Sequence, residues 1–103
     1  MKDEKIRKIL NKYGEENEVT FKLFENPSFD ESIVGISNDQ RVVYDYDLMI
    51  EEFAKENQCT AEEAEEFIQY NTMRALPYFD DIDGNKPVII ENKLGNLEAF
   101  YGD

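Results

Sequence analysis

The chain has 103 residues, the size of one domain, and its 41% of hydrophobic residues favours a single folded core over a disordered chain. Its 24 acidic and 11 basic residues give a formal charge of −13, which disfavours direct binding to DNA or RNA because their phosphates repel it. The lack of histidine and the single cysteine exclude imidazole-based catalysis, zinc sites of histidine and thiolate ligands, and an internal disulfide.

Residues 2–13 predict a first helix, because apolar residues recur there at the spacing of one helical face: Ile6, Ile9, Leu10 and Tyr13. We expect Gly14 to end this helix. The next segment, 19–24, alternates apolar residues with others, which favours a strand. Pro27 then predicts a loop, since proline supplies no hydrogen-bond donor to a sheet.

Segments 32–37 and 41–46 are rich in β-branched and aromatic residues, and three polar residues separate them, so they predict a β-hairpin. Helical spacing of apolar residues then continues from Tyr46 to about Asn57, with Asp45 or Asp47 available as the N-cap. This is the second predicted helix. Three acidic residues are expected on its solvent side: Glu51, Glu52 and Glu56.

A third helix begins at Thr60, because Thr60 and Glu63 have the spacing of a capping box, and Pro77 ends it. Its apolar stripe is expected to contain Ala64, Phe67, Ile68, Asn71 and Ala75. Asn71 is an unusual member of such a stripe. It is either a hydrogen-bonded polar group of the core or a residue that contacts a partner.

A turn at 83–85 leads into a final predicted strand at 87–91. The expected order of elements is therefore α, β, β, β, α, α, β, in a single domain that spans residues 1–103. Because the strands mostly follow one another, we expect a two-layer α+β fold, in which about three helices cover a small antiparallel or mixed sheet of about four strands.

The negative charge is concentrated in the middle of the chain. Residues 1–43 carry 9 acidic and 7 basic residues, residues 44–83 carry 12 and 2, and residues 84–103 carry 3 and 2. Such a segment attracts basic surfaces, so the predicted partner is a basic protein surface. The candidate partner-binding residues are Glu51, Glu52, Glu56, Glu62, Glu63, Glu65, Glu66, Asp80, Asp81 and Asp83.

Runs of glutamate on a helix are also common as solvated faces with no partner. Five aromatic residues flank the acidic segment: Tyr44, Tyr46, Tyr70, Tyr78 and Phe79. Tyrosine beside carboxylates suits a contact surface, although a position in the core or at its edge is the alternative for each ring.

We expect no metal, no cofactor and no catalysis. The aspartates before Gly84 resemble part of a calcium loop, but aligning Gly84 with the sixth loop position puts Ile90 at the twelfth, where a carboxylate is required. Cys59 precedes a helix but has no base or oxyanion motif with it, so we expect an inert thiol. A hydrolase with paired carboxylates would need a cleft, which so short a chain without tryptophan hardly offers.

The segment from Gly35 to Ile90 contains the runs GIS, RVVYDYDLMIEEF, TAEEAEEFIQYNTMRALPYF and PVII. In the order of these parts it resembles a family of short acidic proteins of phages and mobile elements of Gram-positive bacteria, which has no established activity. The resemblance implies a bacterial host cell. It also implies a role among inhibitors of host defence, such as anti-CRISPR proteins, some of which imitate DNA by displaying carboxylates in place of phosphates.

The sequence also lacks any run near the roughly 20 apolar residues of a membrane helix, and its start has no signal-peptide pattern. We therefore expect a cytoplasmic protein without a membrane partner. The first functional hypothesis is an inhibitor that occupies the basic nucleic-acid channel of an effector such as a CRISPR nuclease. The alternative is a non-catalytic accessory domain that self-associates, for example as a homodimer, and whose acidity serves solubility.

Overall fold

The computed structural model describes residues 2–25, 27–78 and 86–91. Its elements are α1 (Lys2–Asn17), a 3₁₀ turn η1 (Asp30–Ser32), β1 (Ile33–Ile36), β2 (Val42–Asp45), α2 (Tyr46–Asn57), α3 (Ala61–Phe67), a π-helical segment η2 (Ile68–Met73), a 3₁₀ turn η3 (Leu76–Tyr78) and β3 (Val88–Ile90). The α+β class is confirmed. The predicted turn at 83–85 lies outside the described residues.

The sheet is mixed and has the strand order β1-β2-β3 in the described part of the chain. The predicted hairpin is confirmed, because β1 pairs with β2 in antiparallel fashion. The predicted final strand is confirmed as β3, which pairs with β2 in parallel. Tyr44 lies at the centre, opposite Ile33 on one side and Ile89 on the other. The parallel pairing requires a crossover, and α2 and α3 supply it.

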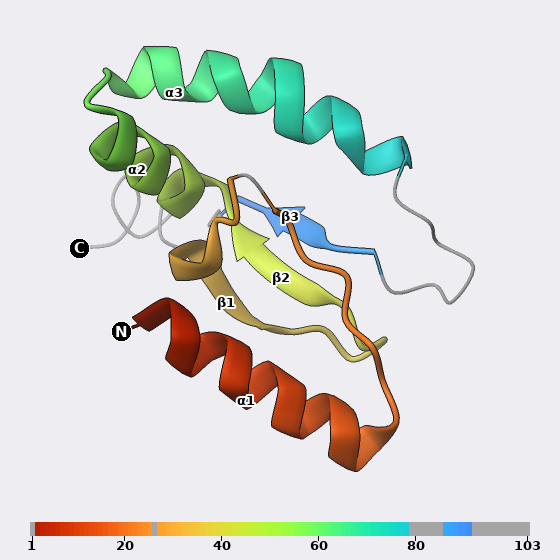
Figure 1. Ribbon diagram of the computed structural model, residues 1–103. Helices are drawn as coiled ribbons and strands as arrows, with labels where there is room; N and C mark the ends of the chain where they lie inside the picture. Colours follow the sequence, from red (N-terminus) through yellow and green to blue (C-terminus); the bar gives the residue numbers. More distant parts are fainter. Residues whose placement is uncertain (1, 26, 79–85, 92–103) are drawn as a thin grey trace, which may run out of the picture.

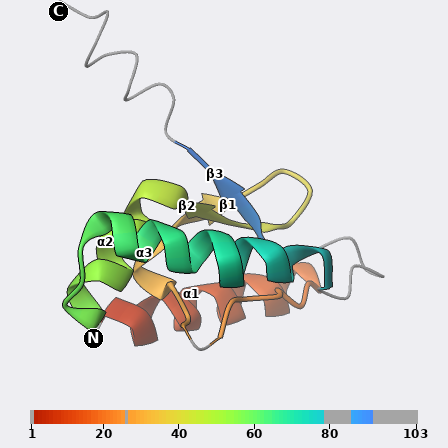
Figure 2. The same cartoon turned by 90° about the horizontal axis from the view of Figure 1, so that it is seen from above.

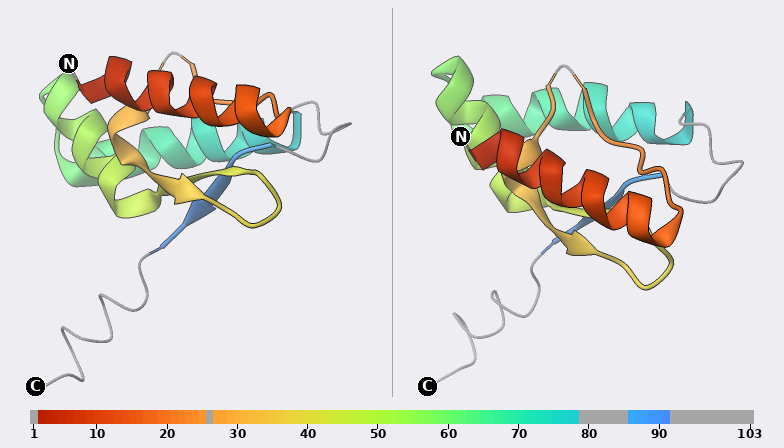
Figure 3. Two further views of the ribbon diagram at one scale, coloured as in Figure 1. Left: turned by 90° about the horizontal axis from the view of Figure 1, so that it is seen from below. Right: turned by 60° about the horizontal axis from the view of Figure 1, so that its bottom comes forward.

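Helices α1 and α3 lie over the same face of the sheet, near its two opposite edges, while α2 lies at one end of the strands (Figures 1 and 2). Residues 19–25 and 27–29 run between α1 and α3 over this face (Figures 1 and 3). No described helix covers the other face (Figure 2). The core fills the space between the layers: Leu10, Phe24, Phe29, Val42, Tyr44, Tyr46, Met49, Ala64 and Ile68.

The strand predicted at 19–24 is wrong, because these residues form an irregular segment that joins no sheet. Its most deeply buried residue is Phe24, which lies off the face that the alternation had predicted as buried. The Phe24 ring packs edge-on against Tyr44, with 4.8 Å between ring centroids, and its N–H donates to the Tyr44 hydroxyl at 3.1 Å. This hydrogen bond and ring contact hold the irregular segment against the central strand of the sheet.

Gly14 does not end the first helix, which continues for three more residues to Asn17. The chain then turns through Glu18, whose φ of 57° is left-handed, and the Val19 N–H donates to the Gly14 carbonyl at 2.8 Å. A Cβ at position 14 would lie 2.4 Å from the Val19 carbonyl oxygen. Position 14 therefore requires glycine because the following chain approaches it closely. This close approach, and not the end of the helix, explains the glycine at this position.

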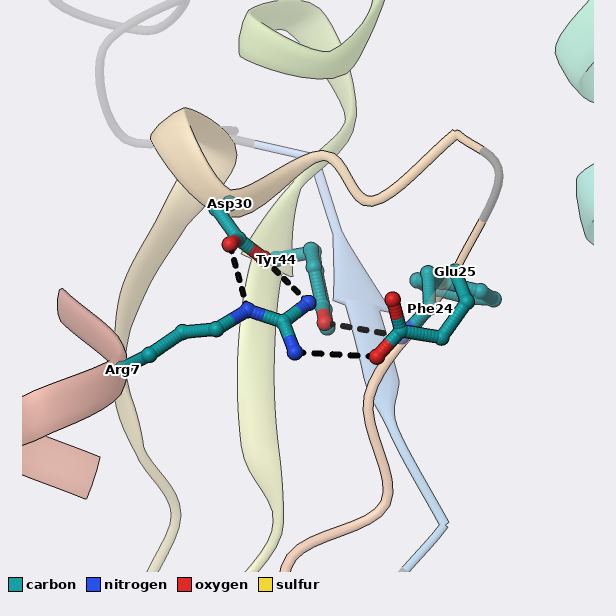
Figure 4. Close-up of polar contacts among 5 residues, drawn as sticks. All are labelled: Arg7, Phe24, Glu25, Asp30 and Tyr44. Carbon is teal, nitrogen blue, oxygen red and sulfur yellow. Dashed lines mark hydrogen bonds and ion pairs between the residues drawn. The ribbon is translucent and has the colours of Figure 1, made fainter. Parts of the chain in front are cut away.

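Arg7 ties α1 to the segment that crosses the sheet (Figure 4). Its guanidinium donates to both carboxylate oxygens of Asp30, at 2.6 and 3.0 Å, and to Glu25 at 2.9 Å. The Asp30 side chain is 4% exposed, whereas that of Glu25 is 62% exposed. These hydrogen bonds, that of Asp30 first, raise the pKa of Arg7 further above its already high usual value. The arginine is therefore charged at neutral pH and far above it.

Candidate protein-binding helix pair

The candidate site is the pair of helices α2 and α3, which carry seven of the ten predicted residues. Asp45 caps α2 by accepting a hydrogen bond from the Leu48 N–H at 3.1 Å, so one of the two predicted caps is confirmed. The capping box of α3 is also confirmed: the Thr60 hydroxyl accepts from the Glu63 N–H at 3.1 Å, and the Glu63 carboxylate accepts from the Thr60 N–H at 3.2 Å.

Glu52 corrects the sequence prediction for α2. It is only 8% exposed and accepts a hydrogen bond at 2.8 Å from the hydroxyl of Ser32, which is fully buried. The physical reason is that η1 packs against this face of α2, so position 52 lies between two elements that are distant in sequence. Glu52 is therefore a buried structural carboxylate and cannot reach a partner. Its neighbours Glu51 and Glu56 are exposed, as predicted.

All four glutamates of α3 are exposed, but they differ in what they already bind. Glu63 belongs to the capping box, and Glu65 accepts a hydrogen bond from the Tyr46 hydroxyl at 3.0 Å, which joins α3 to α2. Gln69 donates to the same hydroxyl at 2.6 Å. Glu62 and Glu66 accept no side-chain hydrogen bond or ion pair from other described residues.

We call Glu51, Glu56, Glu62 and Glu66 the open carboxylates, because each is exposed and free of hydrogen bonds and ion pairs in the described part of the chain. Asp47, in the first turn of α2, is a further exposed carboxylate that the sequence suggested only as a cap. Asp80, Asp81 and Asp83 lie outside the described residues. Their predicted role is therefore still a prediction.

The aromatic residues divide between core and surface. Tyr44 and Tyr46 are buried, at 0% and 6% exposure, which is the core alternative stated above. Tyr70 is 58% exposed, and the Arg74 guanidinium lies 4.7 Å from its ring centroid. The side chain of Tyr78 and all of Phe79 lie outside the described residues.

Asn71 also corrects the predicted stripe of the third helix. Ala64 and Ile68 are fully buried, but Asn71 and Ala75 are exposed and Thr72 is buried in their place. The cause is η2, because a π-helical turn contains about one residue more than an α-helical turn and moves the buried face from position 71 to position 72.

The described part of the chain gives little support for a metal site, a reactive thiol or a membrane-spanning helix. It contains no group of three or more His, Cys, Asp or Glu side chains that could hold a metal ion. Cys59 is half-buried and unpaired, and its N–H donates to the Ala54 carbonyl at 3.1 Å as part of the α2 terminus. None of the described helices is long and apolar enough to cross a membrane.

No protein-family model, no curated protein and no solved structure matches this chain. The resemblance to short phage proteins therefore stays a prediction.

Proposed function

We propose that this protein is a non-catalytic inhibitor that binds the basic nucleic-acid channel of an effector, such as a CRISPR nuclease, through the helix pair α2 and α3. One observation carries the proposal: the helix pair displays the four open carboxylates on a segment that has almost no cations. Residues 46–67 contain eight acidic residues and a single basic one, Lys55.

Open carboxylates suit binding better than paired ones. Each keeps both oxygens available to accept hydrogen bonds from arginine or lysine of a partner, and no internal ion pair has to break first. The four open carboxylates lie on helices, which present them in a fixed arrangement and lower the ordering cost of association. The buried Glu52 contributes charge to the composition but nothing to such a contact.

The test compares two quadruple variants that change the net charge equally. The acidic-pair variant replaces the open carboxylates with glutamine: Glu51→Gln, Glu56→Gln, Glu62→Gln and Glu66→Gln. The control replaces four exposed glutamates on α1 and η1: Glu4→Gln, Glu15→Gln, Glu16→Gln and Glu31→Gln. Neither set includes the capping-box residue Glu63 or the Tyr46 partner Glu65.

Each protein is titrated into a panel of purified CRISPR nuclease–guide RNA complexes that hold fluorescent target DNA, and DNA release is followed by anisotropy. Wild type and control should release DNA at similar concentrations. The acidic-pair variant should need about tenfold more protein, because four exposed pairs at about 0.4 kcal/mol each make about 1.6 kcal/mol. Equal curves for the two variants, or no release from any complex, would contradict the proposal.

A second candidate, self-association, is favoured by one apolar groove. This groove lies between α1 and the edge strand β1, has a volume of about 260 Å³, and is bordered by Ile9 and Val34, which are 55% and 51% exposed.

Light scattering after size-exclusion chromatography tests this candidate. A homodimer that persists at about 1 M salt and becomes monomeric on Val34→Lys would support it, since apolar contacts are not screened by salt. A monomer at all concentrations would exclude it. Salt-sensitive DNA release by a monomer would favour the first candidate.

A further inference from the structure

The apolar groove between α1 and β1 shares no residue with the helix pair. Helix α1 lies alongside β1 (Figures 1 and 3), and the groove between them is lined by Ile6, Ile9 and Leu10 of the helix and by all four residues of the strand. None of these residues has a polar side chain. The volume of about 260 Å³ is below the roughly 300–1,000 Å³ of pockets for small molecules, so the groove suits a few side chains of a protein or peptide.

The strand side of the groove is open to a further chain. In the described part of the protein β1 pairs with β2 alone, so one row of its backbone N–H and C=O groups faces away from the sheet. Val34 is the extra residue of a β-bulge, which leaves it without a partner on β2, and it is 51% exposed. A free sheet edge of this kind can accept an extended peptide as an additional strand.

Gly35, inside β1, favours the close approach of another backbone. Its φ lies outside the left-handed region, and a Cβ at this position would meet nothing within 4 Å. Neither the local conformation nor the packing of this chain therefore requires glycine here. A glycine inside a strand often marks a place where another backbone approaches closely, and the open space at Gly35 leaves room for one.

The charge at the rim of the groove indicates which peptide fits. Lys5 and Lys12 are neighbours of Ile9 on the helix surface, four positions before it and three positions after it, and both are exposed. Neither lysine forms a hydrogen bond or an ion pair with the other described residues. In a chain with a formal charge of −13, this rim is a local site of free positive charge, and its complement is a carboxylate.

A second copy of the chain is a poorer occupant of this groove than an acidic peptide. A two-fold contact places the same surface of both copies face to face, so a contact centred on Ile9 would bring the Lys5 and Lys12 side chains of both copies together. Like charges at an interface weaken association. A segment in which carboxylates flank apolar side chains has no such cost.

We propose that this groove binds an extended acidic segment of a protein partner, which adds to the edge of β1 as a strand. Two aliphatic side chains of the segment enter the groove beside Ile9, because alternate residues of a strand point to the same face. Carboxylates before and after them pair with Lys5 and Lys12, which lie roughly 10 Å apart along the helix. Three or four extended residues span roughly 10–13 Å, which matches this separation. The inference goes beyond the proposed function, since it assigns a second surface.

The test uses three peptides and the whole chain labelled with ¹⁵N. The acidic peptide has the sequence ELTLE and is blocked at both ends. The neutral peptide has glutamine in place of both glutamates, and the polar peptide has serine in place of both leucines. The acidic peptide should move the amide signals of residues 5–12 and 33–36. The neutral peptide should bind about fourfold more weakly, because two exposed ion pairs are lost, and the polar peptide should move no signals there.

The net charge of the protein makes this comparison stringent. A chain with a formal charge of −13 repels an acidic peptide at every surface that has no local positive charge. Tighter binding of the acidic peptide than of the neutral one therefore requires the lysines at the rim.

Matched variants locate the contact. Lys5→Gln with Lys12→Gln removes the charge of the rim and should abolish the preference for the acidic peptide. Lys8→Gln with Lys55→Gln changes the net charge equally and should keep the preference, because Lys8 lies roughly 100° around α1 from Ile9 and Lys55 lies on α2. Ile9→Gln should weaken binding of the acidic peptide about tenfold, since 55% of this residue is left for the peptide to bury.

Three results would overturn the inference: tighter binding of the neutral peptide, shifts that Ile9→Gln leaves unchanged, and no binding of any peptide. A dimer whose groove signals no peptide moves would also overturn it, because the groove would then belong to a second copy. None of these results affects the proposed function, which is judged by DNA release with variants of the helix pair.

Discussion

Replacing Asp30 with asparagine should test how far the Arg7 cluster stabilises the fold. Asp30 is 3% exposed, and its carboxylate accepts two hydrogen bonds from the Arg7 guanidinium. The asparagine side chain would have the same size, but its amide NH₂ would face guanidinium donors and the charge pairing would be lost.

The expected loss follows from the geometry. A hydrogen bond to a charged group contributes roughly 1.5–3 kcal/mol, and the second bond is broken in the same variant, so we expect about 3 kcal/mol for Asp30→Asn. That is a large part of the roughly 5–15 kcal/mol by which a domain of this size is usually stable. It corresponds to a fall in melting temperature of roughly 12–24 °C.

Glu25→Gln is the matched control, because Glu25 pairs with the same guanidinium but its side chain is 62% exposed. Water and salt screen that pair, so its loss should cost at most about 1 kcal/mol. Both variants are unfolded with urea at neutral pH and followed by circular dichroism. If Asp30→Asn and Glu25→Gln lowered the free energy of unfolding by the same small amount, burial would not set the strength of this cluster.

Three further predictions concern single positions. Gly14→Ala should lower the free energy of unfolding by about 1–3 kcal/mol despite the higher helix propensity of alanine, because its Cβ would lie 2.4 Å from the Val19 carbonyl oxygen. Gly35→Ala is the control and should change the free energy of unfolding little, because a Cβ at that position would have nothing within 4 Å. The melting curves of the two variants check this. Burial raises the pKa of Tyr44 from 10.0 to about 12, so the neutral phenol contributes about 3 kcal/mol to the free energy of unfolding. This contribution is complete below pH 10 and is lost as the pH rises through about 12. Tyr44→Phe should remove this step from a plot of stability against pH, and a plot that the substitution leaves unchanged would refute the assignment. Glu52→Gln should leave DNA release by the protein unchanged, since the residue is buried, and a weakening as large as that of the acidic-pair variant would show that position 52 reaches the partner.

Elements that depend on neighbouring residues were predictable from the sequence. The Asp45 cap and the Thr60–Glu63 capping box are confirmed because each joins residues three positions apart. The hairpin is confirmed because its two strands follow each other in the chain with only a short loop between them. The same holds for the exposure of Glu51 and Glu56, which lie on a regular helix.

Predictions that required knowledge of a distant contact failed. The alternation in 19–24 is the same for a strand and for an extended segment, and only the packing of Phe24 on Tyr44 decides between them. Position 14 contains the residue type of a helix end, yet it serves the close approach of Val19.

The candidate site shows the same division. The sequence alone determined that residues 44–83 concentrate negative charge and that two helices carry most of it, because charge and helical period can be counted along the chain. The tertiary structure decided which carboxylates are open, since η1 covers Glu52 and Tyr46 binds Glu65. It also moved the buried position of the third helix from Asn71 to Thr72 through η2, because the exposure of a side chain depends on elements that are distant in sequence but adjacent in space.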